Sequence, residues 1–110
     1  MPYTMREEGD VLIFAFTGFL GHRDSYGFLE AVRGHVAAGA KRIVVSLEGV
    51  DKVNSSGIGV LAALVVSAGN AKASLRFACI PEHAWKIMTI VGLARVVENH
   101  GSVEEAISNL

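Results

Sequence analysis

The chain has few of the features that mark secreted, membrane-spanning or nucleic-acid-binding proteins. Its only cysteine, Cys79, can form no internal disulfide, as is typical of proteins from a reducing compartment. A net charge of −1 gives no electrostatic reason to expect nucleic acid or an anionic membrane as a partner. The longest apolar run, residues 58–68, is about half of the ~20 residues that a bilayer crossing needs. Direct membrane insertion is therefore not expected.

The N-terminal residues, MPYTMREE, have the pattern of neither a signal peptide nor a transit peptide. Hydrophobic residues make up 51% of the 110 residues, which excludes a disordered chain. A chain of this length can bury a core without disulfides or metals. We therefore expect one soluble, cytoplasmic domain spanning residues 1–110.

Apolar runs of strand length alternate with longer segments of helical spacing. The pattern predicts strands at residues 2–6, 11–16, 43–47, 73–80 and 93–98, with residues 17–21 ending the second strand. It predicts helices from a cap at Asp24 or Ser25 to about residue 38, from residue 54 or 55 to 70, from residues 81–82 to 92, and after a capping box at residues 102–105.

This order, β-β-α-β-α-β-α-β-α, predicts an α/β sandwich with four helices on a mixed, mostly parallel sheet of about five strands. Strands joined through helices run parallel with right-handed crossovers. The first strand is joined to the second by a tight turn, so it should run antiparallel at one edge of the sheet.

The segment that joins the 43–47 strand to the following helix carries two adjacent hydroxyls, Ser55 and Ser56, after Asn54. Asn54 and Ser55 are both good N-cap residues, because a side-chain oxygen can accept a free N–H of the first turn. Those N–H groups and the helix dipole also favour a negative charge there. Ser55 is therefore a candidate site for phosphate attachment, although its role could equally be that of a cap.

The run Asn54-Ser55-Ser56-Gly57-Ile58-Gly59 and the element order together resemble the STAS domain of anti-sigma factor antagonists. The family pattern at this place is an aspartate, two hydroxyl residues, Gly-Leu-Gly and an aliphatic run. The Gly18 and Leu20 positions, Gly92-Leu93 and the closing Val103-Glu104-Glu105-Ala106 also resemble the family, so the likeness spans nearly the whole chain.

The resemblance implies a binding protein of bacterial partner switching that needs no cofactor. In that family the first hydroxyl is the phosphate acceptor, here Ser55, with Ser56 as the runner-up. The implied partners are an anti-sigma factor that is a GHKL-type serine kinase, and a serine phosphatase that removes the phosphate. The implied partner-binding residues are Asp24, Asn54, Ser55, Ser56, Gly57 and Ile58.

STAS domains also serve without phosphorylation, as subunits or scaffolds of membrane transporters and signalling complexes, and the resemblance leaves this alternative open. The helix after Asn54 has almost no polar face, which predicts an exposed apolar docking patch near its N-terminus, with Ile58, Ala62 and Val66 as test positions.

Catalysis is not expected. A serine nucleophile needs a base within hydrogen-bond reach, and no histidine has a spacing that pairs it with Ser55. The histidines also show no metal-ligand spacing with one another or with Cys79, which we expect to be a core thiol. We expect surface or loop positions for all of them: His22, His35, His83 and His100.

Overall fold

The structure, a computed structural model, describes residues 2–21 and 23–110. It contains the strands β1 (Tyr3–Glu8), β2 (Val11–Leu20), β3 (Arg42–Val53), β4 (Ser74–Ala78) and β5 (Asn99–His100). The helices are α1 (Arg23–Ala37), α2 (Ser55–Asn70), α3 (Glu82–Ile90), the short 3-10 helix η1 (Leu93–Arg95) and α4 (Val103–Ser108). The predicted α/β class and the predicted order of strands and helices are confirmed.

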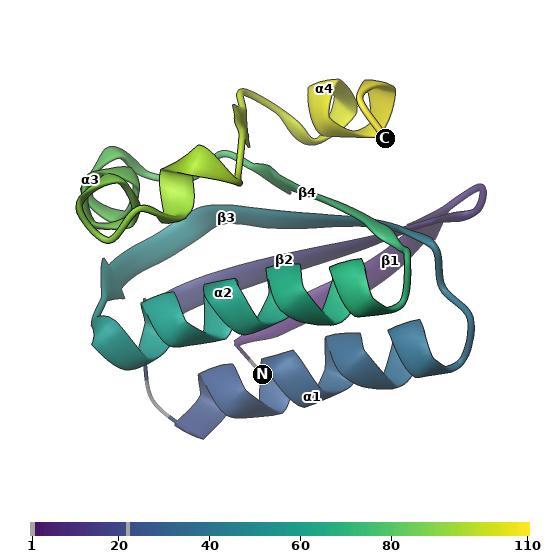
Figure 1. The fold of residues 1–110 in the computed structure, drawn as a ribbon, viewed down its shortest axis with the longest axis horizontal. Helices are drawn as coiled ribbons and strands as arrows, with labels where there is room; N and C mark the ends of the chain where they lie inside the picture. The colour runs from purple at the N-terminus through teal and green to yellow at the C-terminus, as the bar shows by residue number, and fades with distance from the viewer. Residues whose placement is uncertain (1, 22) are drawn as a thin grey trace.

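The five strands form one sheet in the order β1-β2-β3-β4-β5. β1 pairs antiparallel with β2, and the other three pairs are parallel. α1 and α2 lie side by side across one face of the sheet, whereas α4 lies on the other face (Figure 1). α3 and η1 lie at the end of the sheet where α2 begins (Figure 1).

The side chains of the strands alternate between two cores. Leu12, Phe14 and Phe16 of β2 face α1 and α2 and belong to the larger core, which Phe28 of α1 also enters. The opposite alternation makes a smaller core under α4, made of Val11, Ile13, Val44, Ala78 and Ala106. The central strands β2 and β3 are therefore apolar on both faces, as the sheet's two helical layers require.

β2 and β3 run further than predicted. β2 was predicted to end at residue 16, but it continues to Leu20, and β3 continues beside it to Val53. The pairing shifts register twice along this extension, and Gly18, with φ of +87°, takes part in the second shift. Such irregularities increase the local twist of a strand pair without ending it. The extension carries the chain directly to the start of α2.

The C-terminal third differs more. The predicted strand at residues 93–98 is wrong: a left-handed turn at Gly92 leads into η1, and β5 follows later as only two residues. The Asn99 side chain bonds both the N–H and the C=O of Ile80, which positions β5 beside the end of β4. β4 is shorter than predicted because Cys79 has a φ of +57°, which is not a strand conformation.

The predicted helix caps are confirmed at two places and wrong at one. Asn54 caps α2, and the Ser102 hydroxyl accepts the N–H of Glu105 at the start of α4. Asp24 and Ser25, by contrast, lie inside the first turn of α1. In the described part of the chain, no helix has both the length and the apolar character that crossing a bilayer requires.

Candidate functional site

The candidate site is the junction where the ends of β2 and β3 meet the first turn of α2. Leu20 pairs with Val53 at the end of the parallel ladder. The N–H of the next residue, Asn54, still donates to the Leu20 carbonyl at 3.3 Å. The first turn of α2 is therefore held directly against the end of β2, with no loop between β3 and the helix.

Asn54 bonds in two directions across this junction. Its Oδ1 accepts the N–H of Gly57 at 3.0 Å, which makes it the N-cap of α2. Its Nδ2 donates to the carbonyl of Gly21 at 3.3 Å, across to the segment that follows β2. A carboxylate at this position could serve as the cap but could not donate the second hydrogen bond. The asparagine thus joins α2 to β2 as well as starting the helix.

Gly57 is required by close backbone contact. A Cβ added there would lie 2.0 Å from the carbonyl oxygen of Leu20, a distance that real side chains do not show. Gly21 is similarly constrained, because its added Cβ would lie 2.1 Å from Oδ1 of Asn54. Gly59 is different, since a Cβ there would meet no atom within 4 Å. Of the two glycines in the Gly-Ile-Gly run, the protein's own fold explains only the first.

Ser55 is the first residue of α2, and its side chain is exposed to solvent. Because Asn54 accepts the Gly57 N–H, Ser55 is not the cap of this helix. Its hydroxyl has no hydrogen-bond partner within residues 2–21 and 23–110. Ser56 is half-buried beside it. The backbone N–H groups of Ser55 and Ser56 have no intrahelical acceptor, because they lie in the first turn.

The charge around the junction also favours an added anion. The first turn of α2 contains no acidic residue, so no charge within the helix offsets the positive end of its dipole. Lys52, two residues before the cap, lies with its ammonium 5.8 Å from the centre of the Phe19 ring. The exposed Asp51 is the acidic residue nearest to Asn54 in the chain. The helix end is thus open to a negatively charged group.

The structure brings together most of the residues implied by the resemblance. Asn54, Ser55, Ser56, Gly57 and Ile58 are consecutive at the start of α2. Asp24 is exposed in the first turn of α1. α1 and α2 begin at the same end of the molecule (Figure 1). Among the residues that the structure describes, no hydrogen bond or ion pair connects Asp24 to the junction.

The exposed apolar patch predicted near the N-terminus of α2 is wrong, because Ile58 and Val60 are buried there. Ile58 is 7% exposed and packs in the larger core, so it supports the junction from inside. Ala62 is half-buried, and Val66 is 59% exposed. α2 tolerates its lack of a polar face because α1 covers one side of it, with Nε of Arg33 donating to the Ser67 hydroxyl at 3.0 Å.

Sequence reasoning missed the residues of β2 and β3 that complete the site. Leu20 and Gly21 provide the carbonyls that hold Asn54, and Phe19 and Lys52 form the neighbouring surface. The close contact at Gly57 is the reason for a glycine two residues after Ser55, and that glycine was the only signal of the contact in the sequence.

The sequence predicts surface or loop positions for all four histidines, and the structure does not confirm this for all of them. His83 is exposed, His35 is half-buried against the ring of Phe14, and His22 lies outside the described residues. His100 contradicts the prediction: it is 5% exposed, on β5 beneath α4. Its ring nitrogens lie 3.6 Å from carboxylate oxygens of Glu98 and Glu105.

Cys79, which was predicted to be a core thiol, directly follows β4 and packs against the smaller core, where its side chain is half-buried. Desolvation, and secondarily the nearby Glu48 carboxylate, raise the pKa of the Cys79 thiol above its ordinary value. Across the described residues, no three His, Cys, Asp or Glu side chains are grouped as metal ligands would be.

With this architecture and site in place, the class of the protein follows: a small α/β sandwich built around a strand-to-helix junction. The family model described as the STAS domain matches residues 3–106, and the chain therefore belongs to the STAS domain family. Comparison with curated protein sequences gives no match.

Solved structures share the fold at low sequence identity. The unphosphorylated anti-sigma factor antagonist SpoIIAA, whose Bacillus form is also solved phosphorylated, is similar at 16% identity and a TM-score of 0.82, over 97% of this chain and 94% of that one. An anti-sigma factor antagonist from Mycobacterium paratuberculosis has 16% identity and a TM-score of 0.84, over 97% and 91%. A sulfate transporter family protein from Wolinella succinogenes has 11% identity and a TM-score of 0.74, over 93% and 85%.

Proposed function

We propose that this protein is an anti-sigma factor antagonist that binds a serine-kinase anti-sigma factor through the start of α2 and is switched by reversible phosphorylation of Ser55. The observation that carries the proposal is that Asn54, and not Ser55, caps α2. Asn54 caps the helix, so the exposed Ser55 hydroxyl has no structural role within the described residues. The protein would work by binding and not by catalysis.

A phosphate on Ser55 would change the partner surface without disturbing the fold. It adds roughly −1.5 to −2 charges at pH 7. The free N–H groups of the first turn and the helix dipole stabilise that charge within the chain. An acidic partner surface at this place would be repelled, and an apolar one would bind less tightly because the phosphate would have to be desolvated. The switch therefore acts on the complex and leaves the free protein folded.

The partner surface would consist of the first turn of α2 together with its surroundings. Asn54, Ser55 and Ser56 offer polar groups, and Gly59 leaves an unobstructed stretch of helix one turn further on. A glycine in an exposed helix costs up to about 1 kcal/mol relative to alanine. Close approach by a partner's backbone explains why a glycine is kept at position 59. Asp24 would contact the partner from α1.

The test is phosphorylation by the kinase that is purified with this protein, in the presence of ATP. We expect one phosphate on the wild-type chain, none on Ser55→Ala, and full labelling of the matched control Ser56→Ala. Labelling that persists in Ser55→Ala, or is absent from the wild type, contradicts the proposal. Isolation with a transporter ATPase subunit in place of a GHKL-type kinase supports the alternative, a STAS subunit that is not phosphorylated.

A further inference from the structure

The outer edge of β4 is open over half of its length. β5 pairs only with Phe77 and Ala78. On this outer side, opposite β3, no strand of the described residues lies beside Ser74, Leu75 and Arg76. The Ser74 N–H points inward and donates to the Lys41 carbonyl at 2.7 Å. Because backbone groups alternate along a strand, the N–H and C=O of Leu75 point outward, toward the place where a further strand would lie.

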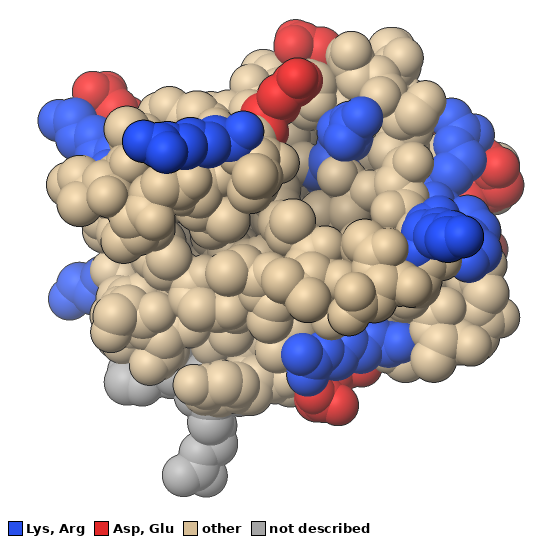
Figure 2. All heavy atoms as spheres, viewed as in Figure 1, with Lys and Arg blue, Asp and Glu red and all other residues tan. Residues whose placement is uncertain are grey.

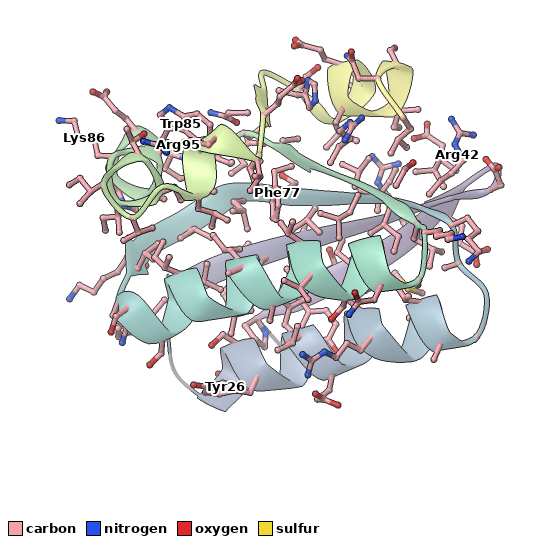
Figure 3. All side chains as sticks on the ribbon, viewed as in Figure 1. Tyr26, Arg42, Phe77, Trp85, Lys86 and Arg95 are labelled. Carbon is pink, nitrogen blue, oxygen red and sulfur yellow. The ribbon has the colours of Figure 1, made fainter. Side chains whose placement is uncertain are left out.

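A cavity of about 240 Å³ lies along this open edge. Its apolar lining comes from Val65 and Ala68 of α2, Leu75 and Phe77 of β4, and Val97 before β5. Figure 2 shows the hollow in the middle of this face, and Figure 3 shows Phe77 between β4 and α2. A cavity of about 150 Å³ is enough to hold a benzene molecule, so this one can hold an aliphatic side chain.

The charges around the cavity are mostly positive. Lys72 and Arg95 are exposed and each precedes a lining residue; Arg95 is the last residue of η1 (Figure 3). Arg76 lies on the opposite face of β4, where its Nε donates to the Asn109 carbonyl. Glu98 is the one acidic residue in the lining. The rim thus complements a ligand with negative charge at both ends.

We propose that this edge is a second docking surface, which binds an extended segment of a partner polypeptide as an added strand beside β4. The segment's backbone pairs with Leu75. Its central apolar side chain enters the cavity, and acidic residues on either side meet Lys72, Arg76 and Arg95. Main-chain hydrogen bonds give affinity in this mode, and alternate side chains give specificity. A second copy of this chain is disfavoured as the occupant, because two such edges would bring like charges together.

The surface is separate from the proposed phosphorylation site. α2 has 16 residues and is therefore about 24 Å long, with Ser55 at one end and the cavity near the other. Binding at the edge of β4 does not depend on a phosphate or on a kinase. The two proposals can therefore fail independently.

In the experiment, the isotope-labelled full chain is titrated with a short, end-blocked synthetic peptide of alternating glutamate and valine. Binding is monitored by NMR through the chemical shifts of the backbone amides. We expect shifts at Leu75, Phe77 and Val97 that saturate and weaken as salt is added. Ser55→Ala should bind the peptide as the wild type does. The controls are a peptide with lysine in place of glutamate and one with a central proline, and neither should bind.

Two protein variants test the contacts. Leu75→Pro removes the outward N–H at an edge position where proline is tolerated, and should weaken binding about tenfold, the value of one hydrogen bond. The double variant Lys72→Glu with Arg95→Glu changes only exposed residues and should abolish binding without changing the unfolding temperature. Three results would each overturn the proposal. The double variant could bind the peptide with the wild-type affinity, or the peptide could shift only the resonances at the start of α2. The third is that raising the protein concentration alone, without peptide, shifts the resonances of β4.

Discussion

The contrast between Gly57 and Gly59 gives the sharpest test of the junction. In Gly57→Ala the new Cβ would lie 2.0 Å from the Leu20 oxygen and 2.7 Å from its carbonyl carbon. Distances under 3.0 Å are essentially never seen, so the first turn of α2 must move by about 1 Å from the end of β2. The obstacle is backbone, which cannot turn aside as a flexible side chain could.

That movement stretches the hydrogen bonds from the Asn54 N–H to Leu20 and from Gly57 to Asn54. Overpacking costs about 1–3 kcal/mol and each weakened bond about 1 kcal/mol, while alanine's helix propensity returns about 1 kcal/mol. We therefore expect a net loss of about 2–4 kcal/mol in the free energy of unfolding, which lowers the Tm by roughly 10–15 °C in a chain of this size.

The matched control is Gly59→Ala in the same helix, where the new methyl meets no atom within 4 Å. It should raise the stability by about 0.5–1 kcal/mol. Thermal and urea unfolding, followed by circular dichroism, measure both variants. A Gly57→Ala variant that unfolds at or above the wild-type temperature would refute the close contact between α2 and β2.

Three further predictions concern single side chains. Asn54→Ala should lose about 1–2 kcal/mol of stability with its two hydrogen bonds. Asn54→Asp keeps the cap and loses only the bond to Gly21, so it should lose less, about 0.5–1 kcal/mol; chemical denaturation measures both, and equal losses would contradict the capping role. Ser55→Glu should gain about 0.3–1 kcal/mol from the helix dipole, and a loss measured by the same method would show that the helix end does not accept negative charge. Cys79 should react with iodoacetamide more slowly at pH 8 than a cysteine in an unstructured peptide, because its pKa is raised. Glu48→Gln should speed the reaction by lowering the pKa of the thiol. An unchanged pH–rate profile in that variant would contradict the effect of Glu48 on Cys79.

The sign of the Cys79 contribution to stability follows from the same shift. Burial raises the pKa of the folded thiol, so the unfolded chain loses its proton first as the pH rises. Ionisation of Cys79 should therefore have no effect on stability at neutral pH, where the thiol is protonated in both the folded and the unfolded chain. It should destabilise the fold as the pH rises above the thiol's ordinary pKa.

The elements that could be predicted from sequence are those with a local cause. The start of α2 is set by Asn54 and its short-range bond to Gly57, and the start of α4 by Ser102 and Glu105. Alternating strands and helices were enough to predict a mostly parallel sheet. The order of elements and the position of Ser55 at a helix start were therefore predictable.

What could not be predicted depends on contacts between distant segments. The extension of β2 to Leu20 depends on β3 running beside it through two register shifts. The late position of β5 depends on Asn99 bonding to Ile80, 19 residues earlier. The burial of His100 follows from that position, beneath α4. Nothing within any one of these segments carries a signal of its distant partner.

We propose that a charge on Ser55 controls partner binding while the fold is unchanged. The most direct measurement is the affinity of the kinase partner for this chain with and without phosphate on Ser55. We predict that the phosphate weakens binding more than 100-fold, a coupling of about 3 kcal/mol, while the circular dichroism spectrum stays the same. Equal affinities of the two forms would contradict the account.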